Sequence, residues 1–379
     1  MLPPNDDGDD LAQVLAHGGG VEATDRSGRT IRQLAALFDT MPPDMLRRLP
    51  GGAADGPTGG PAPTPRPSPA NGPREAVARA LPILQMTGVT FRQKAGCVSC
   101  HNNTLLGTLT AEARRSGVAF DEHTATAEAE GIGRFLESWR ERAIQGLGIP
   151  GDADTISYIL VGLGDEHHPA DAATDALVYF LLRKQQADGR WRTVAHRPPI
   201  ESSDITVTAM SMRAIQIYAP AVWSQRAKAA VAAAGKWLAA RTPRMTEERT
   251  FQLRGLAWAD RSLKDRRRRG VALASEQRAD GGWSQLPTRE SDAYATGQAL
   301  LALHEGAGMP VSDPVFQRGV AFLLRTQYAD GTWMVESRSI PVQPLFDIGF
   351  PHGSRNQWIS AAGTNWAATA LAIAARPSR

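Results

Sequence analysis

The sequence contains little cysteine and no long apolar run. Only two of its 379 residues are cysteines, so no second thiolate pair exists to complete a four-ligand structural zinc site. No apolar stretch approaches the roughly 20 residues that a helix needs to cross a bilayer. The net charge of +3 is too small to argue for a nucleic-acid partner. With 42% hydrophobic residues, however, the chain can bury a sizeable core.

Both cysteines lie in one short motif, C-V-S-C-H at residues 97–101. C-x-x-C-H is the attachment signature of a c-type haem. The two thiols add across the two haem vinyl groups, and the adjacent imidazole becomes the proximal iron ligand. The sequence therefore predicts one covalent haem c per chain, held by Cys97, Cys100 and His101. A redox dithiol and a chance match are the alternatives. The motif leaves the sixth iron ligand open, and the candidates include Met86 and His352.

The chain begins with an acidic, polar segment at residues 1–7 rather than with a secretory signal. Haem c is normally attached outside the cytoplasm. We therefore expect a periplasmic or otherwise extracytoplasmic protein whose true N-terminus lies upstream; otherwise the haem interpretation fails.

Residues 1–49 form a small N-terminal appendage. Residues 20–36 resemble one ankyrin repeat, with an Asp-x-x-Gly-x-Thr turn and an Ala-Ala helix. A lone repeat cannot bury its own hydrophobic face, which again suggests missing upstream sequence. An unrelated helical hairpin is the alternative. Residues 50–73 follow as a Pro/Gly-rich linker, whose prolines disfavour a helix or a central strand.

From about residue 74 onward apolar residues recur at helical spacing, and β-branched alternation is scarce. This pattern predicts an all-α domain over residues 74–379. Three near copies of Q-x-x-D-G-x-W punctuate it, at residues 185–191, 277–283 and 327–333. In each copy we expect the Asp-Gly pair to make a turn and the tryptophan to pack back on a helix pair.

The recurring Q-x-x-D-G-x-W resembles the repeat of the terpene cyclase and prenyltransferase superfamily, which includes the squalene-hopene cyclases. The resemblance covers roughly residues 75–379. It implies an α/α toroid of about six helical hairpins, with an inner and an outer ring of helices around a cavity. Together with C-V-S-C-H-N-N and the ankyrin-like start, it is similar to a bacterial squalene-cyclase-like subgroup. The resemblance also makes an apolar or isoprenoid ligand in the cavity a candidate.

Squalene-hopene-type cyclases start catalysis with the middle Asp of D-x-D-D-T-A, which protonates an alkene. The segment that aligns with this motif begins at Asp204, and Thr206 and Val207 stand where the acid pair should be. A threonine cannot protonate an alkene, so the motif is degraded. Asp204 and Asp292 remain as catalytic candidates. Helix capping is the more ordinary role for both.

Several other residues complete the predicted site. Tyr294 and Trp366 lie on or near expected inner helices and are candidates for lining the cavity, although such aromatics are more often simply core. The long connection at residues 334–360, which holds Phe350 and His352, is expected to cover one mouth of the toroid. A basic run contains Arg266, Arg267, Arg268 and Arg269. It predicts a solvated helix face, with peripheral membrane contact as the alternative.

The leading hypothesis is a haem c redox or electron-transfer protein built on a squalene-cyclase-like toroid. One alternative is an isoprenoid cyclase that acts in the toroid cavity. Another is a binding module without catalysis. Whether the chain is an enzyme is left open, and the sequence indicates neither a redox partner nor an oligomeric state.

Overall fold

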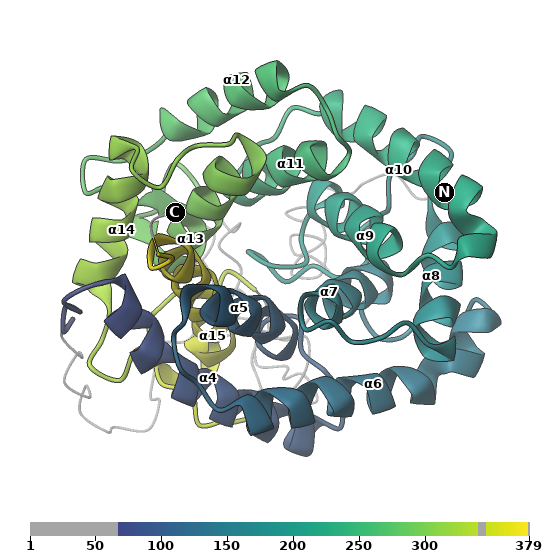
Figure 1. Cartoon of the computed structure of the whole chain (residues 1–379), viewed down its shortest axis with the longest axis horizontal. Coiled ribbons are helices and arrows are strands. Elements are labelled where there is room, and N and C mark those ends of the chain that lie inside the picture. The colour runs from purple at the N-terminus through teal and green to yellow at the C-terminus, as the bar shows by residue number, and fades with distance from the viewer. Residues whose placement is uncertain (1–66, 340–345, 378–379) are drawn as a thin grey trace, which may run out of the picture. The chain divides into compact units, whose positions relative to one another are not determined.

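Twelve α-helices build the part of the chain that the structure, a computed structural model, describes: residues 67–339 and 346–377 (Figure 1). They are α4 Pro73–Ala95, α5 Asn103–Ser116, α6 Glu122–Ile144, α7 Asp152–Asp165, α8 Ala172–Lys184, α9 Asp204–Tyr218, α10 Ser224–Ala239, α11 Thr246–Trp258, α12 Leu263–Ala274, α13 Ala293–Leu301, α14 Pro314–Thr326 and α15 Gly353–Ala374. Two short antiparallel strands, β1 Trp283–Ser284 and β2 Ser291–Asp292, precede α13. The predicted ankyrin-like segment, residues 1–49, lies outside the described residues.

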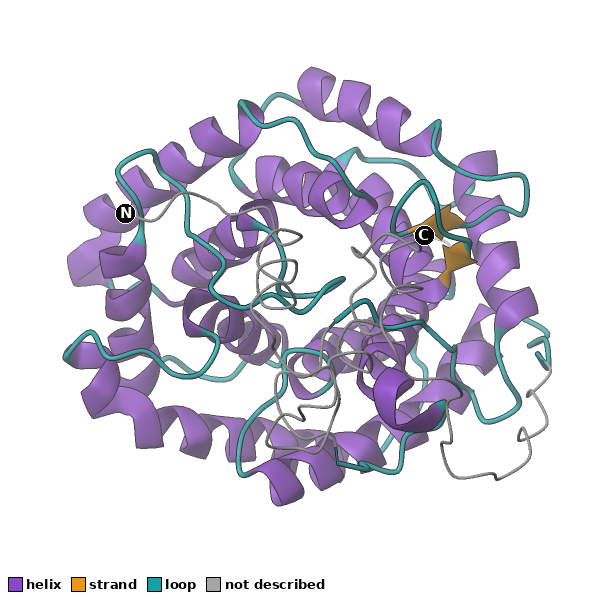
Figure 2. Ribbon diagram, turned by 180° about the vertical axis from the view of Figure 1, so that it is seen from behind, coloured by secondary structure: helices purple, strands orange, loops and turns teal. Residues whose placement is uncertain are grey.

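The helices form two concentric rings (Figures 1 and 2). The inner ring consists of α5, α7, α9, α11, α13 and α15, and the outer ring of α4, α6, α8, α10, α12 and α14. Helix α15 packs against both α13 and α5, so the last hairpin meets the first and the inner ring closes. The all-α toroid of six helical hairpins that the sequence predicted is confirmed.

Each copy of Q-x-x-D-G-x-W makes the same hydrogen bonds around its tryptophan. The indole is fully buried, and its N–H donates to a carbonyl of the preceding outer helix. These pairs are Trp191 with Leu181, Trp283 with Leu273 and Trp333 with Leu323, at 2.8–2.9 Å. The backbone N–H of the same tryptophan donates to a threonine hydroxyl of the next inner helix: Thr208, Thr296 or Thr364. Each tryptophan therefore joins an outer helix to an inner one.

The glutamine of each copy joins its turn to the following outer helix. Its side-chain amide donates both to the glycine carbonyl of the turn and to a carbonyl of α10, α14 or α4. In the last copy, Gln327 Nε2 donates to Ala76 O at 2.8 Å, across 251 residues of sequence. The third repeat thus closes the outer ring.

The described end of the linker lies against this closure. Ser68 N–H donates to Gln327 O at 2.7 Å, and Ala70 N–H donates to Leu324 O at 3.3 Å. Helix α4 begins at Pro73, the last residue of the predicted linker. A proline at the first helical position has no intrahelical N–H partner to lose. The toroid therefore starts slightly before the linker was expected to end.

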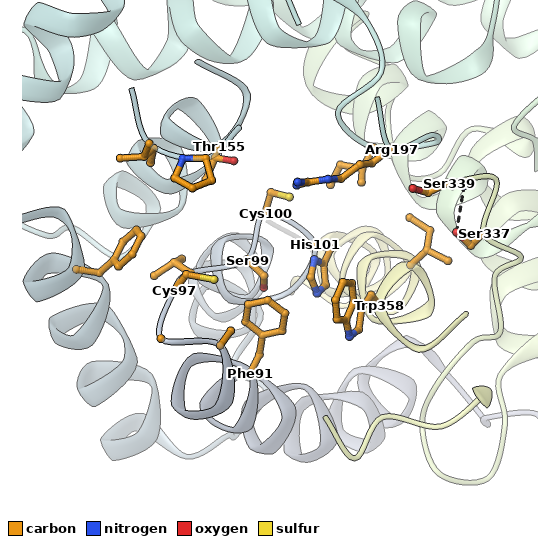
Figure 3. A pocket seen from close by; sticks show the side chains of 18 of the residues that line it. Phe91, Cys97, Ser99, Cys100, His101, Thr155, Arg197, Ser337, Ser339 and Trp358 are labelled. Atoms are coloured by element: carbon orange, nitrogen blue, oxygen red, sulfur yellow. Dashed lines mark hydrogen bonds between the residues drawn. The ribbon is translucent and has the colours of Figure 1, made fainter. Parts of the chain in front are cut away.

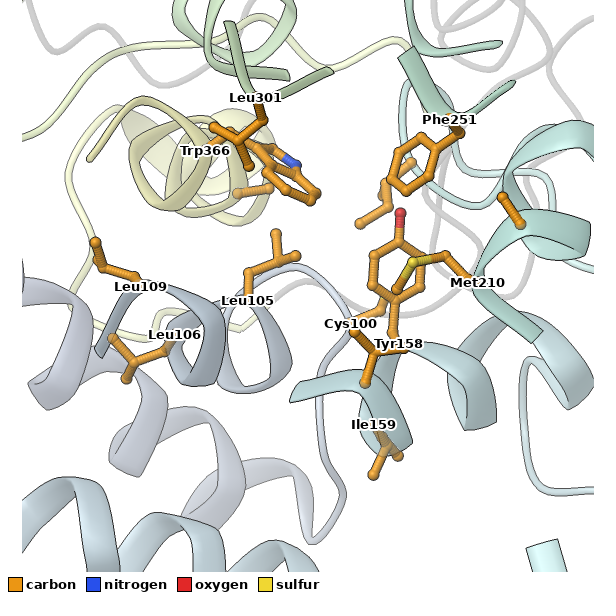
Figure 4. Packing of buried hydrophobic residues seen from close by; sticks show 14 of the residues in the cluster. Cys100, Leu105, Leu106, Leu109, Tyr158, Ile159, Met210, Phe251, Leu301 and Trp366 are labelled. Atoms are coloured by element: carbon orange, nitrogen blue, oxygen red, sulfur yellow. The ribbon is translucent and has the colours of Figure 1, made fainter. Parts of the chain in front are cut away.

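Side chains fill the middle of the inner ring (Figure 4). Leu105, Tyr158, Met210, Phe251 and Trp366 come from five different inner helices, and each is at most 3% exposed. The ring centroids of Tyr158 and Phe251 are 6.4 Å apart, and those of Phe251 and Trp366 are 6.0 Å apart. The centre that the resemblance led us to expect as a cavity is instead packed at this level.

Candidate functional site

A cavity of about 440 Å³ lies at the N-terminal ends of four inner helices (Figure 3). Most of the segments that line it precede or begin α5, α7, α9 and α15, and the outer helices α4 and α6 supply the rest. Its volume is typical of a small-molecule site. Cys97, Cys100 and His101 all line this cavity. The motif singled out in the sequence therefore borders a cavity large enough for a small molecule.

Polar residues of the motif fix its loop in place. Ser99 Oγ accepts hydrogen bonds from the N–H groups of Asn102 and Asn103, at 3.2 and 3.1 Å, at the start of α5. Asn102 Nδ2 donates to Thr87 Oγ1 of α4 at 3.0 Å. Asn365 Nδ2 of α15 donates to Asn102 Oδ1, also at 3.0 Å. The loop is thus held by the first and the last hairpin together.

The imidazole of His101 is enclosed by aromatic rings. It stacks on Trp358, with ring centroids 5.3 Å apart, and meets the ring of Phe91 edge-on at 5.0 Å. Its Nε2 is buried and has no hydrogen-bond partner among the described residues. Burial, and then the charge of Arg197, lower the pKa of His101 to about 3. The ring is therefore neutral near pH 7, which is the form that ligates a metal.

Both cysteine thiols are free and protonated at neutral pH. Burial raises the pKa of Cys97 above its ordinary value. Burial also raises the pKa of Cys100 well above its ordinary value, and the carboxylate of Glu201 adds to this effect. Reactive redox dithiols show the opposite behaviour, because their function needs a lowered thiol pKa. This environment therefore disfavours the redox-dithiol alternative.

The two aspartates proposed as catalytic candidates make hydrogen bonds and an ion pair outside the cavity. Asp204 accepts a hydrogen bond from Thr193 N–H at 2.9 Å and pairs with Arg190 at 3.2 Å. Asp292 caps α13 by accepting from Ala295 N–H at 2.8 Å. Neither is among the residues that line the cavity. The expected capping role is therefore seen for Asp292 only, because the cap of α9 is Ser203 and Asp204 is the first residue of that helix.

Sequence reasoning missed a buried acid, Glu247, at the start of α11. Its carboxylate accepts hydrogen bonds from Tyr294 Oη at 2.7 Å and from Thr206 Oγ1 at 3.1 Å. Burial raises the pKa of Glu247 to about 7. In the sequence this glutamate looks like an ordinary acidic residue in the first turn of a helix, so no pattern there could have marked it.

The remaining candidates lie away from the cavity. Tyr294, Trp366 and Phe350 are buried in packed regions, and none of them lines it. His352 Nε2 is 2.7 Å from Thr332 Oγ1, and Met86 is half-exposed on α4. The structure therefore brings neither proposed sixth ligand, Met86 or His352, to the motif. The connection at residues 334–360 does border the cavity, through Ser337, Ser339 and Trp358.

In the basic run on α12, two arginines bind neighbouring backbone and two are exposed to solvent. Arg266 and Arg269 donate to backbone carbonyls of neighbouring segments, whereas Arg267 and Arg268 are exposed.

No helix in the described ranges is long and apolar enough to cross a membrane. Nor do the described residues contain a group of three or more His, Cys, Asp or Glu side chains placed to hold a bare metal ion.

Comparison with known proteins finds solved structures with a similar fold, but no similar sequence. No model of a known protein family matches the sequence, and no curated protein matches it significantly. A crystal structure of a protein from Actinoplanes is similar with a TM-score of 0.52 and 13% identity, over 80% of this chain and 99% of that one. Two structures of variants of the type II terpene cyclase MstE from Scytonema are also similar. The complex with merosterolic acid A has a TM-score of 0.46 and 12% identity, over 79% of this chain and 98% of that one. The complex with geranylgeranyl dihydroxybenzoate has a TM-score of 0.44, with the same identity and coverage.

Proposed function

We propose that this chain is a redox protein that binds one c-type haem covalently in the cavity at the mouth of its toroid. The observation that carries the proposal is that the three residues of the motif meet at one cavity. Both cysteines and the following histidine line one cavity, and the buried Nε2 of that histidine has no partner among the described residues. Cysteine thiols spaced as C-x-x-C and followed by histidine are the donor set of haem c.

The residues present fit such a group. Cys97 and Cys100 would hold it through thioether bonds, and His101 would ligate its iron as a neutral imidazole. The walls are mainly apolar and include Phe135 and Trp139 of α6. Apolar walls suit the body of a porphyrin, and they keep water away from it. A haem bound here supplies one-electron oxidation and reduction.

Aromatic packing gives His101 a defined orientation. Trp358 covers one face of the imidazole, and Phe91 presses against it edge-on. A ligand ring held from two sides needs little reorganisation when it coordinates. The chain itself therefore supplies a preoriented neutral imidazole, two nearby thiols and an apolar lining of the cavity.

We further propose that the protein works outside the cytoplasm and exchanges electrons with a partner protein, because haem c is normally attached there. Cyclase chemistry is not part of the proposal. Asp204 binds Thr193 N–H and Arg190, Asp292 caps α13, and the aligned Thr206 carries no acidic proton.

The proposal is tested by producing the full chain in a periplasm together with a haem c maturation system. A pyridine haemochrome spectrum of the purified protein should show haem c. Cys97→Ser and Cys100→Ser should each change the spectrum toward a singly attached haem or abolish it. Ser138→Ala is a matched control, because Ser138 lines the same cavity without belonging to the motif. Haem-free wild-type protein would refute the proposal.

A further inference from the structure

The positive charge of the chain is concentrated in one segment, residues 221–278, which we call the basic arc. It contains 14 lysines and arginines against 5 aspartates and glutamates. The whole chain has a net charge of only +3, so the rest of the chain is negative overall. The basic arc includes α10 and α12, which are neighbours in the outer ring, and α11 inside them (Figure 1).

Most of the charge that the basic arc presents to solvent is positive. Two of its five acids are turned away from solvent contacts, because Glu247 is buried and Asp265 pairs with Arg269 on its own helix. The exposed charged side chains of the arc are eight basic ones and two acidic ones. They are Arg226, Lys228, Lys236, Arg241, Arg244, Lys264, Arg267 and Arg268, with the acids Asp260 and Glu276.

The two outer helices of the basic arc contact each other. Arg269 Nη2 of α12 donates to Ala239 O, at the end of α10, at 2.9 Å. Arg266 Nη1 donates to Gly306 O at 2.6 Å. These two arginines hold helices together, so the exposed charge comes from α10 and α12 jointly rather than from the run of four arginines alone.

The opposite part of the outer ring has the opposite charge. Helix α6 lies across the ring from α12 (Figure 1). It contains five glutamates and three arginines, and its Phe135 and Trp139 line the cavity. A negatively charged surface therefore attracts the basic arc and repels α6, which orients the whole domain.

Exposed aliphatic side chains accompany the basic residues of the arc. Val222 is 83% exposed, Val271 71% and Leu263 40%. Peripheral membrane binding uses this combination, because basic side chains reach anionic head groups while apolar side chains enter the boundary with the acyl chains. Anionic lipid thus matches both kinds of side chain, whereas a nucleic acid or an acidic protein surface matches the charge alone.

We propose that the basic arc binds the anionic head groups of a phospholipid bilayer and holds the protein at the membrane surface. A cluster of about 4–8 lysines and arginines is typical of helices that recognise anionic lipid. The arc exposes eight. In this orientation the acidic helix α6, which borders the cavity, is turned away from the lipid. Membrane binding through the arc does not require haem.

Sedimentation of the full chain with lipid vesicles tests the proposal. One set of vesicles contains phosphatidylcholine mixed with phosphatidylglycerol, and the other contains phosphatidylcholine alone. The protein should sediment with the anionic vesicles and stay in solution with the neutral ones. Raising the salt concentration should release it, because salt screens the attraction between exposed charges.

Charge-reversal variants locate the binding surface. Lys228→Glu on α10 and Arg267→Glu on α12 should each lower the partition coefficient roughly tenfold, because each removes one attraction and adds one repulsion. Arg134→Glu on α6 is the matched control, since it changes the net charge equally and its side chain is 70% exposed. It should bind like the wild type, and so should Arg267→Lys.

Two results would overturn the proposal. If the wild type fails to sediment with anionic vesicles at low salt, the basic arc is left for an acidic protein or a nucleic acid. If Arg267→Glu and Arg134→Glu lose equal affinity, net charge rather than the arc determines binding. Neither result bears on haem attachment, which is measured separately by the haemochrome spectrum.

Discussion

The imidazole of His101 and the indole of Trp358 lie nearly parallel, with planes 11° apart and centroids separated by 5.3 Å. His101 lies two residues before the first inner helix, and Trp358 is in the last one. The stack therefore forms only when the toroid closes. The same closure brings Asn365 of α15 to Asn102 beside the motif. The integrity of the ring and the geometry of the candidate haem ligand are therefore coupled.

Replacing Trp358 with leucine should disturb the histidine more than the fold. Loss of the stacked ring removes one wall that orients His101, at a cost of roughly 2 kcal/mol in stability. We expect haem attachment to persist and the electron paramagnetic resonance spectrum of the oxidised iron to become heterogeneous. Trp223→Leu is the control, because Trp223 is also partly buried but packs on Tyr179, outside the cavity. Identical spectra for the wild type and Trp358→Leu would show that the stack does not orient the ligand.

Removing the amide that closes the outer ring should destabilise the toroid. Gln327→Ala would leave the carbonyls of Ala76 and Gly331 without their side-chain donor in a fully buried place. An unsatisfied buried acceptor costs about 1–3 kcal/mol. Thermal unfolding should therefore show a clearly lower Tm. Gln186→Ala is the control: Gln186 is exposed and follows the first glutamine of the first repeat, so this substitution should leave the Tm nearly unchanged. Equal Tm values for the two variants would argue against a closing role for Gln327.

The buried carboxyl of Glu247 should make stability depend on pH. Its pKa is about 7 in the folded chain, against an ordinary value of 4.5. Between these pH values the folded state retains a proton that the unfolded chain has lost, so the free energy of unfolding falls as pH rises. The part due to Glu247 is at most roughly 3 kcal/mol. Denaturant unfolding at pH 5 and pH 8 should show a smaller decrease for Glu247→Gln than for the wild type. An equal decrease in both proteins would mean that Glu247 is charged throughout.

Substituting Asp204 distinguishes the redox account from a cyclase. Asp204→Asn weakens a partly exposed ion pair with Arg190, which should cost less than about 1 kcal/mol. We expect unchanged haem content and no cyclic product from squalene or shorter isoprenoids in either protein. Product formed by the wild type and lost in Asp204→Asn would instead restore the cyclase interpretation.

The repeats made the fold predictable from sequence, because each Q-x-x-D-G-x-W copy makes the same set of hydrogen bonds. Trp191, for example, bonds to the outer helix before it, and Gln185 bonds to the next outer helix. The motif at residues 97–101 drew attention through residue type and spacing alone, and in the structure it lines a cavity. Glu247 could not be found in this way. Its environment comes from burial and from Thr206 and Tyr294, which are more than 40 residues away and are marked by no recurring motif.

The most direct test of the central claim is mass spectrometry of the tryptic peptide that spans residues 95–114 of the matured wild-type chain. This peptide contains both cysteines and His101. The account predicts a peptide that carries one haem bound through both cysteines and that keeps this mass under reducing, denaturing conditions. A peptide recovered with two free thiols after production alongside an active haem c maturation system would contradict it.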